Sequence, residues 1–171
     1  IREIQIIRGA ASLQYGTQFG GLINFVLKEP PIKKIEMITR NTVGSNNLFT
    51  NFTSFGGKRK NFSFYTFYNY KRGNGFRANS KYQSNNFYIK LVQKISSKTD
   101  VSGEITYMKY LAKQAGGLSD RMFYEDPMQS NRSRNWFELD WLLYNVKLNH
   151  KFNEEATLSL NFFGLDAQRN T

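Results

Sequence analysis

The chain has 171 residues, a formal net charge of +11 at pH 7 and no cysteine. Without cysteine there is no disulfide framework and no thiolate metal site, and no apolar run is long enough, at about 18 residues, for a transmembrane helix. The aromatic share of 16% favours strands. The positive charge indicates an anionic partner, such as nucleic acid, lipid head groups or an acidic ligand.

The first expected elements are two short strands, at residues 4–8 and 21–27, joined by a segment rich in glycine. Pro30 and Pro31 then interrupt the pattern and predict a boundary or linker. The chain begins inside an apolar pattern and ends after a strand-like run. We therefore expect it to be part of a longer protein.

Beyond the two prolines, apolar and polar residues alternate with a period of two, which predicts strands. In the clearest case Phe87, Ile89 and Leu91 face one side, while Tyr88 and Lys90 face the other. The strand at 61–70 carries aromatic residues on both faces, and the facing of 48–55 stays open. The seven strands predicted in this part are 34–43, 48–55, 61–70, 86–95, 101–111, 142–152 and 157–169.

The connections between these strands differ in length in a regular way. Short polar segments are expected at 44–47, 56–60, 96–100 and 153–156, and long ones at 71–84 and 112–135. After the first hairpin, short and long connections alternate, which is typical of an outer-membrane β-barrel. A soluble sheet with one solvated face gives the same strand alternation. The aromatic content and the gathering of long loops at one end favour the barrel.

The long connections hold the candidate ligand-binding residues. Arginine suits carboxylate or phosphate ligands because its planar fork makes two parallel hydrogen bonds. The alternative is a solvated loop whose charges pair with Asp120, Glu125 and Asp126. We predict that an anionic ligand binds at the outer loops through Arg77, Lys81, Arg121, Arg132 and Arg134.

Other chemistries find less support in the sequence. The basic and aromatic stretch at 58–72 resembles a platform for single-stranded nucleic acid, but its cations cap the strand ends, as a membrane strand requires. His150 is the only histidine, so a protein metal site is not expected. No catalytic constellation is readable, and we do not expect an enzyme.

The opening segment resembles a known family. IQIIRGAASLQYG at 4–16, followed by FGGLINF at 19–25, is similar to the end of the plug domain of TonB-dependent outer-membrane receptors. Many members have proline where this chain has Ala10. The Gln-Tyr-Gly and Phe-Gly-Gly variants, with the later QAGGLSD and QSNRSRNWF segments, resemble the ferric dicitrate receptor branch.

The resemblance implies a mainly β fold. Residues 1–29 would be the C-terminal part of an α+β plug, and residues 30–171 the first strands, about seven, of a transmembrane antiparallel barrel of about 22 strands. The barrel would lie in the bacterial outer membrane, surrounded by lipid. The structural residues of the plug would be Arg8, Gly9, Gly16, Gly20, Gly21 and Asn24, with a carboxylate such as Glu36 or Glu104 opposite Arg8.

The function implied is active transport of a ferric chelate, either ferric citrate or another carboxylate siderophore. The partners would be the chelate and the TonB energy-transducing complex, whose contact segment is absent from this chain. The chelator would hold the iron, so no cofactor or protein metal site is expected, and no nucleic acid. The alternatives are uptake of another substrate, such as cobalamin, another metal complex or a glycan, and a soluble basic β-domain that binds nucleic acid.

Overall fold

The structure is a computed structural model that describes residues 1–9 and 20–171. Strands β1 (Glu3–Ile7) and β2 (Leu22–Val26) form an antiparallel hairpin. A linker at residues 27–35 leads from this hairpin to the main sheet. Within the described residues, no helix combines the length and the apolar character needed to cross a bilayer.

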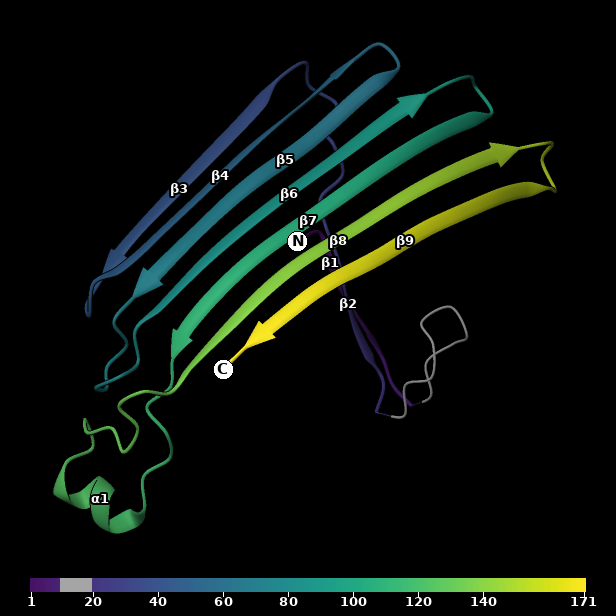
Figure 1. Ribbon diagram of the computed structural model, residues 1–171. Helices are drawn as coiled ribbons and strands as arrows, with labels where there is room; N and C mark the ends of the chain where they lie inside the picture. Colours follow the sequence, from purple (N-terminus) through teal and green to yellow (C-terminus); the bar gives the residue numbers. More distant parts are fainter. Residues whose placement is uncertain (10–19) are drawn as a thin grey trace.

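The main sheet contains seven antiparallel strands, and their order in space is their order in the chain (Figure 1). The seven predicted strands are all present, because alternating apolar and β-branched residues fit a pleated surface. Their bounds are β3 (Glu36–Gly44), β4 (Leu48–Arg59), β5 (Phe62–Gly73), β6 (Tyr82–Lys94), β7 (Thr99–Lys113), β8 (Trp136–Lys151) and β9 (Thr157–Asn170).

Several connections are shorter than the sequence indicates. Gly56 and Gly57, predicted as a turn, belong to β4, and the turn itself is at Lys60, whose φ is +52°. Strand β8 begins at Trp136 rather than near residue 142, because the ladder with β7 continues up to the pair Lys113–Trp136. Because β5 extends to Gly73, β6 begins at Tyr82 and β7 extends to Lys113, the long connections are reduced to 74–81 and 114–135.

The longer connection contains a helix that the sequence analysis did not predict. Helix α1 (Asp120–Glu125) has six residues, and the Ser119 side chain caps its first turn by accepting a hydrogen bond from Met122 N at 3.4 Å. Residues 114–135 are therefore partly ordered by local hydrogen bonds.

The sheet has two chemically different faces. We call the face that the linker contacts the inner face, and the opposite one the outer face. Across β5 to β9 the register aligns outer residues Phe64, Leu91, Gly103, Val146 and Phe162, while the next row, on the inner face, is Tyr65, Lys90, Glu104, Asn145 and Phe163. Successive side chains along a strand point to opposite faces, so period two separates the two sets.

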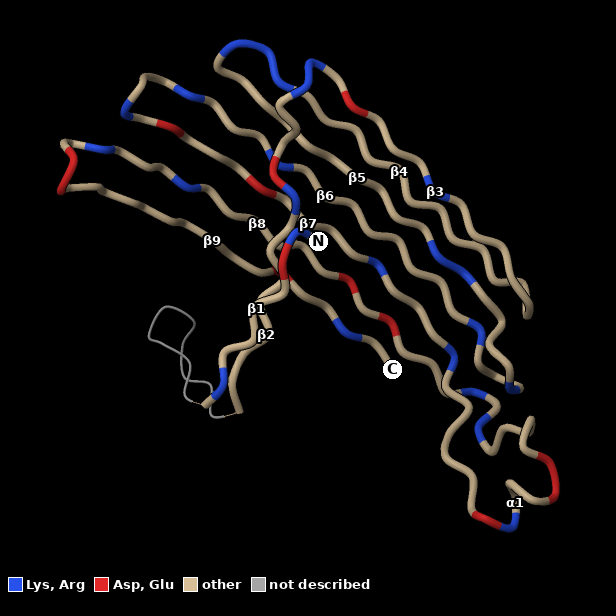
Figure 2. The backbone as a smooth tube through the Cα atoms, turned by 180° about the vertical axis from the view of Figure 1, so that it is seen from behind, with Lys and Arg blue, Asp and Glu red and all other residues tan. Residues whose placement is uncertain are grey.

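The two ends of the sheet also differ. The turns at 60–61, 95–98 and 152–156 lie at one end, and the long loops and α1 lie at the other (Figure 1). Figure 2 shows Lys and Arg at both ends of the sheet, at the short turns and near the long loops. The structure thus has the predicted arrangement of tight turns opposite long loops.

Candidate ligand-binding loops and inner wall

The two long loops contact each other. The Arg77 guanidinium donates from Nε and Nη2 to the Gln129 carbonyl oxygen, at 3.1 and 3.0 Å. Beside it the Ala78 amide donates to the Met128 carbonyl at 2.9 Å. The loop between β5 and β6 therefore supports the one between β7 and β8.

Asn79 holds the neck of the longer loop. Its φ is +54°, in the left-handed region that asparagine tolerates better than most residues. The amide nitrogen lies 3.0 Å from the Gln114 carbonyl and 2.6 Å from the Arg132 carbonyl, with the Asn135 carbonyl at 3.4 Å. One side chain thus joins the beginning of this loop to its end.

Further side chains brace the loop from within. Ser130 Oγ donates to the Ala115 carbonyl at 3.0 Å, and Asn131 Nδ2 donates to the Gly117 carbonyl at 2.5 Å. Gln129 Nε2 donates to the carbonyl of Met122, within α1, at 2.6 Å. Sequence reasoning missed these polar residues, although the density of Ser and Asn was a signal for side chain to backbone bonds.

The candidate ligand residues fall into two groups. Arg77 is partly buried, and its guanidinium is already bonded to the neighbouring loop. Arg121 is exposed and pairs with Glu125 at 3.7 Å across one helical turn. Lys81, Arg132 and Arg134 are exposed. The structure brings the two loops together, and binding of an anionic ligand by these residues stays a prediction.

The glycines of the opening segment have different environments. Gly9 and Gly21 have φ of +76° and +96°, which favour glycine, and a Cβ on Gly21 would lie 2.5 Å from the Ile7 carbonyl oxygen. Gly20 has no neighbour within 4 Å of a Cβ position. Asn24 Nδ2 donates to Gln5 Oε1 across the hairpin, at 2.9 Å. Gly16 lies outside the described residues.

The predicted partners of Arg8 are bonded elsewhere. Glu36 pairs with Lys33 at 3.3 Å, and Glu104 pairs with Lys90 at 3.0 Å. Arg8 itself is exposed. The predicted pairing with Glu36 or Glu104 is therefore wrong, because each carboxylate has a lysine that the linker or the sheet places closer.

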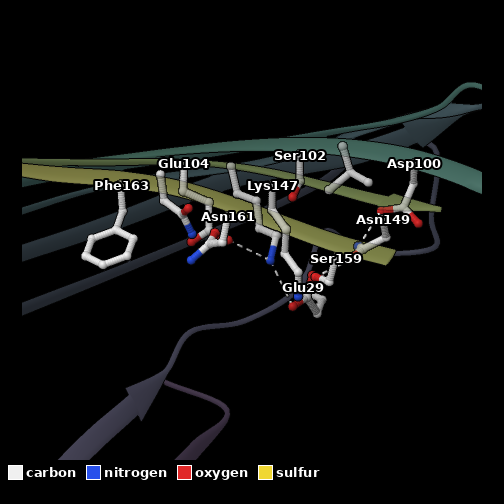
Figure 3. A pocket seen from close by; sticks show the side chains of 12 residues that line it. Glu29, Asp100, Ser102, Glu104, Lys147, Asn149, Ser159, Asn161 and Phe163 are labelled. Carbon is white, nitrogen blue, oxygen red and sulfur yellow. Dashed lines mark hydrogen bonds and ion pairs between the residues drawn. The ribbon is translucent and has the colours of Figure 1, made fainter. Parts of the chain in front are cut away.

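A polar pocket of about 740 Å³ lies on the inner face, between the linker and strands β6 to β9 (Figure 3). Asn149 Nδ2 donates to Asp100 Oδ2, and Ser159 Oγ donates to Asn149 Oδ1, both at 2.9 Å. Among the described residues, Asn145 Oδ1 is a buried oxygen without a hydrogen-bond partner. The lining residues are Glu29, Lys90, Val92, Asp100, Ser102, Glu104, Asn145, Lys147, Asn149, Ser159, Asn161 and Phe163.

A second feature of the pocket is its set of potential metal ligands. In residues 1–9 and 20–171, no group of three His, Asp or Glu side chains is placed to hold a metal ion. His150 lies on the outer face, where its Nδ1 is 2.9 Å from Thr99 Oγ1 and its ring contacts Phe152, with centroids 4.5 Å apart. The inner face of β6 to β9 offers hydrogen-bonding groups and paired charges at this pocket.

Comparison with solved structures identifies the fold. The structure matches the crystal structure of the ferric citrate transporter FecA in the unliganded form, with a TM-score of 0.83 over 97% of this chain. The chain has the fold of part of FecA. Sequence identity is 23%, and this chain spans only 26% of the length of the FecA chain. No family model and no curated protein matches the sequence.

The likeness to FecA confirms the fold that the sequence resemblance implied. This chain is mainly β, and its seven-stranded antiparallel sheet is part of a barrel. At the level of the fold, the structure therefore agrees with the resemblance to the ferric dicitrate receptor branch. What FecA transports is a property of that protein.

Proposed function

We propose that this chain is part of a TonB-dependent receptor of the bacterial outer membrane that transports a ferric chelate. The observation that carries the proposal is the likeness to the ferric citrate transporter FecA over 97% of the chain. In this arrangement residues 1–29 belong to a plug, and residues 30–171 to the wall of the barrel that encloses it.

The outer face supports a membrane setting. Its apolar side chains are exposed, for example Val146 at 50%, Leu160 at 55% and Phe162 at 69% of their surface. Large exposed apolar surfaces are rare on soluble proteins. Strands β4 to β9 have 12 to 16 residues, so each exceeds the roughly 9–11 residues that cross a bilayer.

The loops support an anionic chelate as the cargo. Three exposed arginines, Arg121, Arg132 and Arg134, lie on one loop, whose neck Asn79 closes. Citrate and related carboxylate siderophores present the planar oxygen pairs that arginine binds with two hydrogen bonds. The chelator holds the iron, and TonB supplies the energy for its uptake through contact with a plug segment outside this chain.

The proposal is tested by uptake of ⁵⁵Fe-citrate in a strain whose only ferric citrate receptor is the full-length protein. We expect uptake that requires TonB and falls at least tenfold when Arg132 and Arg134 are both replaced by Gln. Lys109→Gln, on the outer face, is the matched control and leaves uptake unchanged. Unchanged uptake after deletion of the gene would refute the assignment. Uptake of radiolabelled cobalamin or another metal complex instead of ⁵⁵Fe-citrate would refute the ferric chelate.

A further inference from the structure

The linker crosses the inner face along one row of paired residues. The register aligns Gly56, Tyr65 and Lys90 across β4, β5 and β6. Pro31 packs on Gly56, where a Cβ would lie 2.7 Å from its Cδ. Farther along the same row, Glu29 Oε1 lies 2.9 Å from Lys90 Nζ. The linker is thus held at two points, one on each side of β5.

The end of the linker that enters β3 is held by its backbone. The Lys58 amide donates to the Lys33 carbonyl at 2.9 Å. The Lys34 carbonyl lies so close to Gly57 that no side chain would fit there. Because these contacts are uncharged and depend on close backbone approach, salt does not weaken them and their loss would displace the start of β3.

The other end is held by an ion pair that can open. The side chain of Glu29 is 50% exposed, so its carboxylate is easily solvated when the pair opens. The Lys90 side chain is only 14% exposed, and it also lies 3.0 Å from Glu104 Oε1. Removing one partner of a buried ion pair is costly when the other charge is left buried and unpaired. Here Lys90 still contacts Glu104, so release of Glu29 leaves no buried charge unpaired.

The wall beneath the ion pair is fixed. Glu104 Oε2 accepts a hydrogen bond from the Tyr88 hydroxyl at 2.9 Å, and Tyr88 is 1% exposed. The Tyr88 ring stacks on Phe67, with centroids 5.2 Å apart. Lys90 is therefore held by Glu104 whether or not Glu29 is bound.

Two prolines make re-formation of the pair easy. Proline fixes its own φ and restricts the residue before it to extended conformations. Glu29 and Pro30 both precede a proline, so residues 29–31 form a stiff arm. With Pro31 seated on Gly56, this arm holds the Glu29 carboxylate near Lys90 at little cost in entropy.

We propose that Lys90, backed by Glu104 and Tyr88, is a carboxylate-binding latch on the barrel wall that holds Glu29 at rest and releases it during transport. The anchored end of the linker stays on β4 in both states. This inference rests on the proposed function, because it assigns the release to movement of the plug. The latch sets the resting position of β1 and β2 relative to the wall.

The first test reports on the linker without any substrate. This chain has no cysteine, so in the purified full-length protein, with any cysteine outside this chain replaced by serine, a nitroxide label on Lys28→Cys reports the latch end and one on Lys34→Cys reports the anchored end. We expect Glu29→Gln to shorten the rotational correlation time of the label at position 28 at least twofold, with position 34 unchanged. In the protein with Glu29 intact, 1 M salt has the same effect.

The matched control is Glu36→Gln, which removes an ion pair of the same kind, with Lys33, at the anchored end. It leaves the label at position 28 unchanged. The proposal is overturned if Glu29→Gln leaves that label unchanged, or if it loosens both labels equally.

The second test asks whether the latch opens during transport. A reducible cross-linker that spans the replaced ion pair joins Glu29→Cys to Lys90→Cys in cells, and a second pair, Lys33→Cys with Lys58→Cys, joins the anchored end. We expect cross-linking of the first pair to lower ⁵⁵Fe-citrate uptake at least tenfold, with recovery on reduction. The second pair keeps at least half of the uptake.

Normal uptake with the first pair cross-linked, or an equal block by the second pair, overturns the latch. Failure of the protein without cysteine substitutions to take up ⁵⁵Fe-citrate overturns the proposed function instead. The two failures are distinguishable, because the spin-label experiment needs neither cargo nor energy.

Discussion

The two faces of the seven-stranded sheet place similar side chains in opposite situations. On the inner face Lys90 is 14% exposed and contacts two carboxylates. On the outer face Lys109 is 49% exposed and contacts one, Glu138, at 3.4 Å. Two lysines on adjacent strands, β6 and β7, thus differ in exposure and in the number of carboxylates they contact. The face, rather than the residue type, decides what a charge contributes.

The sharpest test of this comparison places the same charge on each face of β8. Val146→Arg puts a guanidinium on the apolar outer face, where a charge at the bilayer midplane costs about 2–4 kcal/mol. Asn145→Arg puts it on the inner face, opposite Glu104, and should change stability by less than about 1 kcal/mol. Unfolding of the full-length protein in lipid vesicles measures both. Equal destabilisation by the two would refute the assignment of the faces.

Two tyrosines that bind carboxylates give the next contrast. The Tyr88 hydroxyl donates to Glu104 at 2.9 Å on the inner face, and the Tyr107 hydroxyl donates to Asp140 at 3.1 Å on the outer face. Tyr88→Phe should cost about 1.5–3 kcal/mol, because a buried hydrogen bond to a charged group is lost. Tyr107→Phe, at a more exposed site, should cost less than about 1 kcal/mol. The same unfolding assay decides, and a larger loss at Tyr107 would contradict the comparison.

The faces were predictable because period two assigns each residue to a side regardless of its partners. The sequence therefore placed Ile89 and Leu91 opposite Tyr88 and Lys90, as the structure does. It did not reveal that Gly56 and Gly57 extend β4, since their role depends on the linker that packs on them. Glycine there was mistaken for a turn signal.

The side-chain contacts of the candidate site were harder to predict. Glu29 and Lys90 are 61 residues apart in sequence, and no local pattern connects them. For the same reason Glu104 was assigned to Arg8, although Lys90 lies nearer. Helix α1 was missed because six residues are too few to show a period of 3.6. Contacts between distant segments are set by register and loop geometry, which composition does not encode.

The loops extend the comparison. There the side chains donate hydrogen bonds to backbone carbonyls, whereas on the inner face they donate to carboxylates. Asn79→Gly keeps the left-handed φ but removes the amide that joins Gln114 to Arg132. We expect a local loss of about 1–2 kcal/mol, from two hydrogen bonds. Trypsin should then cleave faster after Arg132 and Arg134.

The control for the loop is Asn74→Gly, at a position whose side chain is exposed at the beginning of the shorter loop. It should leave the cleavage rate unchanged. If Asn79→Gly cleaves at the rate of the unsubstituted protein, the neck is not held by this amide.

The smallest effect is expected for the outer ion pair, and it completes the comparison. Glu138→Gln removes the partner of Lys109, and both groups are partly solvated, so the loss should stay below about 1 kcal/mol. Lys109→Gln should cost as much, and the double substitution little more, because both remove one interaction. Salt at 1 M should abolish the difference, since it screens exposed charges. A loss above about 2 kcal/mol that persists in salt would show that the outer pair is desolvated like Lys90 with Glu104 on the inner face, and the distinction between the two faces would then fail for charges.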